Sequence, residues 1–165
     1  MSKKNFIKEP AVINMVVNDD SGFLSKFSTH KTSVISPEVA DFLENSAQRF
    51  SPKQRLHLQI EGDCVSENEK ESYALAIKEY FSDEMAAIGR ELRHYNMVAA
   101  ILMAIGIVIL AASIIFPERL WAAVLDIIAW VFIWEAVDII AFRKRELRIR
   151  KFRCRAFVNM KIEYL

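Results

Sequence analysis

The chain has 165 residues, 53% of them hydrophobic and 26% charged, and a formal net charge of +1. After two long apolar runs are set aside, the remaining residues suffice for one small water-facing domain and no more. Cys64 and Cys154 fall in segments that we expect in the cytoplasm, so we expect no structural disulfide. The N-terminal Met-Ser-Lys-Lys-Asn-Phe has no apolar core behind its lysines, so we do not expect it to act as a signal peptide.

The first sixty residues predict two strands and one helix. The β-favouring apolar run predicts a strand over 11–18, and the turn signal at 19–22 ends it. Residues 23–32 form either a loop or a short strand. Ser36-Pro37 combines an N-cap residue with proline at the first helical position, which predicts a helix over 37–47. Strict alternation of apolar and polar residues predicts a strand over 55–61.

A long helix follows. Ser66 and Glu69 have the spacing of a capping box, and apolar residues such as Tyr73, Ile77 and Phe81 recur at helical spacing after it. No proline intervenes before the first apolar run. We therefore predict one continuous helix from about Glu67 to Phe116.

The two apolar runs, 97–116 and 120–142, predict a transmembrane helical hairpin. Each run reaches the roughly 20 residues that a helix needs to cross about 30 Å of hydrocarbon. The link Pro117-Glu118-Arg119 is short enough to force an antiparallel return. Small residues on the first run provide surfaces on which helices approach closely: Ala100, Ala104, Gly106 and Ala111.

The C-terminal part is predicted to return to the N-terminal part. Residues 143–151 can continue as helix, and alternation predicts a strand over 157–164. An isolated strand is unstable, so it should pair with 55–61 or 11–18. The resulting fold is a membrane α-helical hairpin inserted in or fused to a small cytoplasmic α+β domain. The predicted boundaries are 1–95 for that domain, 96–142 for the hairpin, and 143–165 for the basic segment and strand.

The charge distribution predicts the orientation. Eight Lys or Arg residues crowd the thirteen positions from 143 to 155, whereas the link holds one. By the positive-inside rule, both termini are cytoplasmic in a multi-pass protein. Six basic residues are expected to contact anionic lipid headgroups: Arg143, Lys144, Arg145, Arg148, Arg150 and Lys151. A specific phosphoinositide-like headgroup is an alternative, and nucleic acid is not expected because few aromatic residues lie beside these cations.

The second run carries three carboxylates, and the first carries none. Glu135 and Asp138 lie one turn apart, so they share a face of the helix. Three residues of the preceding helix are candidate partners: Arg93, His94 and Asn96. The pair is either a structural clamp at the cytoplasmic end of the hairpin or an ion or proton site.

Asp126 lies several residues in from the outer end, and its nearest polar neighbour on the first run is Ser113. We see no charged partner for it within its own chain. A polar residue of this kind can hydrogen-bond to its copy in another subunit, which would make the protein a homo-oligomer. A water-exposed position near the outer interface and an ion pathway are the alternatives.

Motifs of catalysis are absent from the sequence. The three histidines have no Cys or His partner at metal-ligand spacing, and no Gly-rich phosphate loop or Gly-x-Ser-x-Gly motif occurs. We therefore expect no catalytic residues, no metal, no cofactor and no enzymatic activity.

One resemblance concerns the end of the hairpin. The segment Ile-Trp-Glu-Ala-Val-Asp at 133–138, followed by Arg-Lys-Arg-Glu-Leu at 143–147, resembles the corresponding part of small uncharacterised bacterial two-span membrane proteins. The resemblance implies a bacterial inner membrane and no particular activity.

These observations predict a non-enzymatic, self-associating scaffold or regulatory partner of an unknown protein in the inner membrane. The alternative is an oligomeric membrane effector or ion-conducting element that uses the acidic residues of the second run. Two spans cannot enclose a pathway alone, so the alternative requires several copies.

Overall fold

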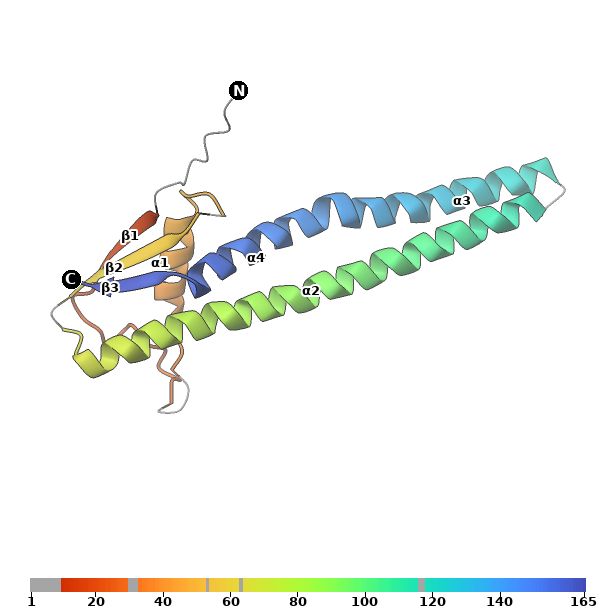
Figure 1. Ribbon diagram of the computed structural model, residues 1–165. Helices are drawn as coiled ribbons and strands as arrows, with labels where there is room; N and C mark the ends of the chain where they lie inside the picture. The colour runs from red at the N-terminus through yellow and green to blue at the C-terminus, as the bar shows by residue number, and fades with distance from the viewer. Residues whose placement is uncertain (1–9, 30–32, 53, 63, 116–117) are drawn as a thin grey trace, which may run out of the picture. The chain divides into compact units, whose positions relative to one another are not determined.

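The computed structural model describes residues 10–29, 33–52, 54–62, 64–115 and 118–165. The chain is mostly helical and contains one small parallel sheet (Figure 1). Parts of the sequence-based predictions lie outside the described residues, namely the N-terminal segment 1–9, the end of the 23–32 segment, and Phe116-Pro117 between the two apolar runs.

The sheet consists of β1 (Ala11–Val16), β2 (Leu56–Glu61) and β3 (Lys161–Tyr164). All neighbouring strands are parallel, and β2 lies in the centre. The first two predicted strands are confirmed to within two residues, and β3 pairs with β2, which was one of the two partners considered. The predicted start of the last strand at 157 is wrong, because α4 continues to Val158 and buries Phe157 from a helix.

Helix α1 (Pro37–Ala47) begins and ends where it was predicted. The Ser36 hydroxyl caps it by accepting the backbone N–H of Val39 at 3.4 Å. The described residues of the 23–32 segment form a loop, in which Leu24 makes an antiparallel bridge with Ile35.

Helix α2 (Glu67–Ile115) is continuous over 49 residues, as predicted. Its start differs in detail from a full capping box. The Glu69 carboxylate accepts the Ser66 backbone N–H at 2.9 Å, as expected, but the Ser66 hydroxyl donates to the same carboxylate at 2.6 Å. Glu69 is thereby held over the helix start, where a negative charge is favourable.

Among the described residues, α2 is the one helix found to be long and apolar enough to cross a membrane. Its most apolar 18 residues have a mean hydropathy of 2.9, and 17% of them are buried. The second predicted run, 120–142, corresponds to α3 (Arg119–Asp138) and to η1, a π-helical turn over Ile139–Arg143. Helix α4 (Lys144–Val158) follows directly, so the basic segment is helical as predicted.

The chain divides into two compact units. The sheet unit contains the residues up to Ala86 together with Arg150–Leu165, and the helical unit contains Ala87–Ile149. The C-terminal residues therefore belong with the N-terminal ones, and the helical unit is an insertion between them. Its boundaries lie about nine residues before the predicted 96 and seven after the predicted 142.

The core of the sheet unit is built from residues of α1, α2 and α4 and of the strands β1 and β2. The Phe81 ring of α2 stacks on the Phe157 ring of α4, with centroids 4.1 Å apart, and both side chains are fully buried. Leu43 of α1 and Leu58 of β2 are also fully buried. Burial of each such side chain stabilises the fold by about 1.5–3 kcal/mol relative to exposure.

Small residues form the contact between α2 and α3 within the helical unit. Ala99, Gly106 and Ser113 recur every seven residues on α2 and are buried, as are Ala129 and Ala136 on α3. A Cβ atom at Gly106 would lie 2.8 Å from Cγ1 of Ile133 and 3.1 Å from the Ala129 carbonyl oxygen. The predicted role of Gly106 in close approach fits this contact. Ala100, Ala104 and Ala111 instead lie on the exposed side of α2.

Candidate functional site

The carboxylate of Asp126 is held within its own chain. The Ser113 hydroxyl lies 2.6 Å from Asp126 Oδ1 and 2.9 Å from the Leu110 carbonyl oxygen, so one hydroxyl proton has two acceptors within reach. The sequence identified Ser113 as the nearest polar neighbour, and the helix register places it there. An ionised carboxylate has about four acceptor positions, and the described residues occupy one of them here.

Glu135 and Asp138 share one cation, Arg143. Its Nη2 lies 3.1 Å from Glu135 Oε1 and its Nε lies 3.4 Å from Asp138 Oδ2, and all three side chains are about half exposed. The predicted partners Arg93, His94 and Asn96 make no recorded hydrogen bond or ion pair to these carboxylates in the part of the chain that the structure describes.

The π-helical turn explains why Glu135 and Asp138 pair with Arg143 and not with the predicted residues of α2. Arg143 follows Asp138 by five residues, which is the hydrogen-bond spacing of a π-helix rather than of an α-helix. The wide turn brings the guanidinium back over both carboxylates, and it places Lys144 rather than Arg143 on the buried side of the helix. No pattern in the sequence indicated a π-helical turn, so the pairing was missed.

The six predicted lipid contacts therefore have different surroundings. Arg145, Arg148 and Lys151 are exposed, as a lipid contact requires. Arg143 is engaged by the two carboxylates. Lys144 is only 7% exposed, and Arg150 donates to Glu84 in the sheet unit at 2.8 Å.

An aromatic groove lies beside the carboxylates on α3. Trp130 and Trp134 are more than half exposed and line a shallow surface groove that ends at Glu135 and Asp138. The four-residue spacing of the two tryptophans places both on the same face of α3.

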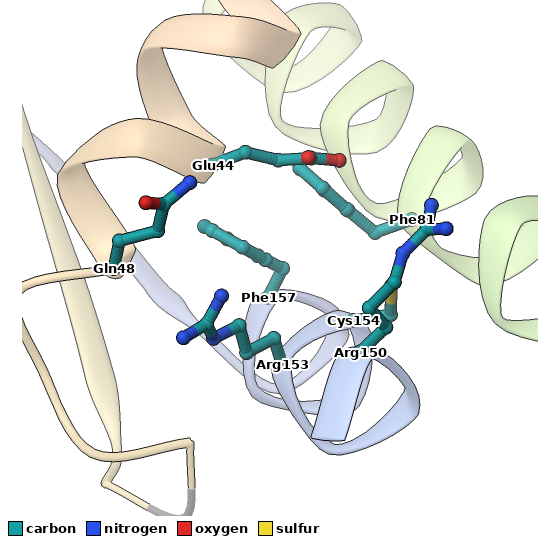
Figure 2. A pocket seen from close by; sticks show the side chains of 7 residues that line it. All are labelled: Glu44, Gln48, Phe81, Arg150, Arg153, Cys154 and Phe157. Carbon is teal, nitrogen blue, oxygen red and sulfur yellow. The ribbon is translucent and has the colours of Figure 1, made fainter. Parts of the chain in front are cut away.

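The sheet unit holds a second hollow that the sequence analysis did not find (Figure 2). Its lining comes from α1, α2 and α4: Glu44, Gln48, Phe81, Arg150, Arg153, Cys154 and Phe157. Burial, followed by the nearby Glu84 and Glu44 carboxylates, raises the pKa of the Cys154 thiol from 9.0 to about 11. The thiol is therefore neutral at physiological pH.

The described residues contain no cluster of three His, Cys, Asp or Glu side chains arranged to hold a metal ion. His57 of β2 lies with Nε2 at 2.9 Å from Glu163 Oε2 of β3, and His94 lies on α2. His30 is outside the described residues.

Comparisons with protein-family models, with curated proteins and with solved structures find no match to this chain. The resemblance to two-span bacterial proteins therefore stays a prediction.

Proposed function

We propose that this chain is a two-span protein of a bacterial inner membrane, in which α2 and α3 cross the bilayer as a hairpin. The observation that carries the proposal is the distribution of side-chain sizes in the helical unit. Among the described residues from Ala99 to Ala136, the buried ones are alanine, glycine and serine, whereas large apolar side chains such as Ile114 (83% exposed) and Phe142 (70%) face outward. The larger buried apolar residues of the unit, Ile88, Ile139 and Leu147, lie outside that stretch.

This distribution fits lipid better than water. In water, exposed apolar surface costs about 25 cal/mol per Å², so large side chains would belong in the contact between the helices. In a bilayer the outward face is solvated by lipid tails, and small residues in the contact let the backbones approach closely. The low buried share of the apolar part of α2 also argues against a core helix of a soluble domain.

The length and the polar groups of α3 also support a second span. Its 20 residues extend about 30 Å at 1.5 Å per residue, close to the thickness of the hydrocarbon core. Each of its three carboxylates has a partner inside the helical unit, which offsets the cost of placing it at membrane depth.

Thiol labelling tests this topology. Cys64 is exposed and belongs to the sheet unit, so a membrane-impermeant maleimide should label it only after intact cells are opened. In a Cys64→Ser background, Glu118→Cys between α2 and α3 should be labelled in intact cells. Cys154 is buried and should stay unlabelled in both experiments. Labelling of both reporters from the same side would refute the two-span topology.

For the activity we propose a non-enzymatic scaffold or regulatory partner that self-associates through the membrane segment. Ser113 occupies one oxygen of Asp126, and the described residues provide no partner for Oδ2. This oxygen is available to a donor from a second copy. The ion-conducting alternative has less support, because Arg143 already neutralises charge at Glu135 and Asp138.

The mass of the purified protein in detergent, corrected for bound detergent, tests self-association. We expect the wild type to form a defined multimer. The Asp126→Leu variant should be monomeric, whereas Asp126→Asn keeps an acceptor oxygen and should still form the multimer. A monomeric wild type would refute the proposal. If vesicles containing the multimer leak ions and Glu135→Gln stops the leak, conduction replaces the scaffold as the function.

A further inference from the structure

The hollow in the sheet unit has an uneven distribution of charge. Two arginines, Arg150 and Arg153, and two carboxylates, Glu44 and Glu84, lie in or beside it, and Arg150 forms an ion pair with Glu84. Arg150 donates to Glu84 at 2.8 Å, and Figure 2 shows the Glu44 carboxylate extending toward the side of Phe81 and Arg150. The Arg153 guanidinium lies on the other side of the Phe157 ring, which in this view comes between it and the Gln48 amide.

Arg153 is the unsatisfied member of the group. Its Nε atom is buried and has no hydrogen-bond partner, and no ion pair is recorded for its guanidinium among the residues that the structure describes. A buried donor without an acceptor costs about 1–3 kcal/mol, and more when the group is charged. An acceptor supplied from outside would remove this cost.

The surroundings of Arg153 select the kind of acceptor. A guanidinium offers its N–H groups as a planar fork, which matches the two oxygens of a carboxylate. The Gln48 amide, which already donates to Asn45 Oδ1 at 3.3 Å, has a second N–H group. The stacked Phe81 and Phe157 rings supply an apolar wall.

The space limits the size of the ligand. The hollow has a volume of about 40 Å³, and one water molecule needs about 10–15 Å³ by the same measure. It therefore accepts a group of a few heavy atoms, which suits a carboxylate better than a phosphate with its five. The hollow is open to solvent, so the remainder of a ligand can extend outward.

We propose that this hollow binds the carboxylate of a small organic acid, with Arg153 as the main binding residue and the Phe81–Phe157 wall against its short carbon chain. The Cys154 thiol is neutral and does not oppose the anion, whereas Glu44 opposes it and favours binding on the Arg153 side. The site is separate from the membrane segment, so it is independent of the proposed topology.

Isothermal titration of the full chain in detergent tests the proposal, with acetate, butyrate and inorganic phosphate as probes. We expect acetate and butyrate to bind, butyrate more tightly because it covers more of the apolar wall, and phosphate to bind at least tenfold more weakly. Arg153→Gln should weaken butyrate binding at least tenfold. Arg155→Gln, on the exposed side of the same helix, is the matched control and should bind as the wild type does.

Arg153→Lys is the second variant, because it keeps the charge and removes the planar fork. It should fold as the wild type does and still lose most of the affinity for butyrate. Equal binding by wild type and Arg153→Lys, or tighter binding of phosphate than of butyrate, would overturn the assignment of a carboxylate. If none of the three probes binds to the wild type, the proposal is refuted.

Discussion

Replacing Gly106 by leucine should destabilise the pair formed by α2 and α3. The Cβ atom alone would lie 2.8 Å from Ile133 Cγ1, about 1 Å less than an optimal contact between carbon atoms. The Ala129 carbonyl oxygen at 3.1 Å blocks a sideways shift, because it belongs to the backbone. The helices must therefore separate, and neighbouring contacts between small residues are lost with them.

The magnitude follows from two opposing terms. Overpacking of a close contact costs up to about 3 kcal/mol, and leucine exceeds glycine in helix propensity by about 1 kcal/mol. The net loss for Gly106→Leu is about 2 kcal/mol. Gly106→Ala should cost less, because its smaller clash is set against a similar gain in propensity.

Unfolding of the purified protein in mixed micelles of increasing SDS content, followed by tryptophan fluorescence, measures this loss. The matched control is Ala104→Leu, since Ala104 lies on the exposed side of the same helix. The control should change the unfolding free energy by less than about 0.5 kcal/mol. Equal stabilities of Gly106→Leu and the control would refute the close packing of α2 on α3.

Three further predictions concern packing, charge and pH. Phe157→Ala should lower the unfolding free energy of the sheet unit by about 3–5 kcal/mol in denaturant titrations, and a loss below about 1 kcal/mol would contradict the buried stack. Arg143→Gln should cost about 1 kcal/mol because its ion pairs are half exposed, and adding Glu135→Gln should recover part of that loss; a double-mutant cycle without coupling would show that the pair contributes nothing. The raised pKa of Cys154 means that the folded state holds this proton more tightly, so its contribution to stability is complete below pH 9 and is lost as the pH rises toward about 11. The Cys154→Ala variant should lack this contribution and therefore lose less stability between pH 8 and pH 11 than the wild type does. Denaturation midpoints of both proteins over this pH range measure the difference, and identical pH profiles would contradict the raised pKa.

The sequence predicted correctly those helices and strands whose residues show a local pattern, such as alternation or a capping pair. The strict alternation at 55–61 and the Ser-Pro pair at 36–37 depend on neighbours in sequence, so β2 and α1 were found within a residue. Phe157 shows where such reasoning fails. Residues 157–164 alternate as a strand does, but Phe157 is buried because α4 brings it onto Phe81, and this tertiary contact extends the helix at the expense of the strand.

The polar contacts also divide into those that regular helix geometry predicts and those that depend on the tertiary structure. Asp126 and Ser113 could be matched from the sequence because an antiparallel pair of regular helices has a calculable register. The pairing of Arg143 with Glu135 and Asp138 depends on one π-helical turn, which changes that register without a signal in the residue pattern. The hollow around Arg153 assembles side chains from three helices far apart in the chain, so composition and periodicity could not reveal it.

The place of β3 in the sheet has a consequence for biosynthesis. Its residues are translated only after the entire helical unit, yet β2 is the central strand and needs β3 on one side. With the proposed topology, membrane insertion must therefore precede completion of the sheet. A chain in which only one of the two helices crosses the bilayer would hold β3 on the opposite side of the membrane from β2. The backbone groups of β2 would then stay unpaired at an open edge, where strand aggregation begins. The folded sheet unit would thus report that both membrane crossings were completed.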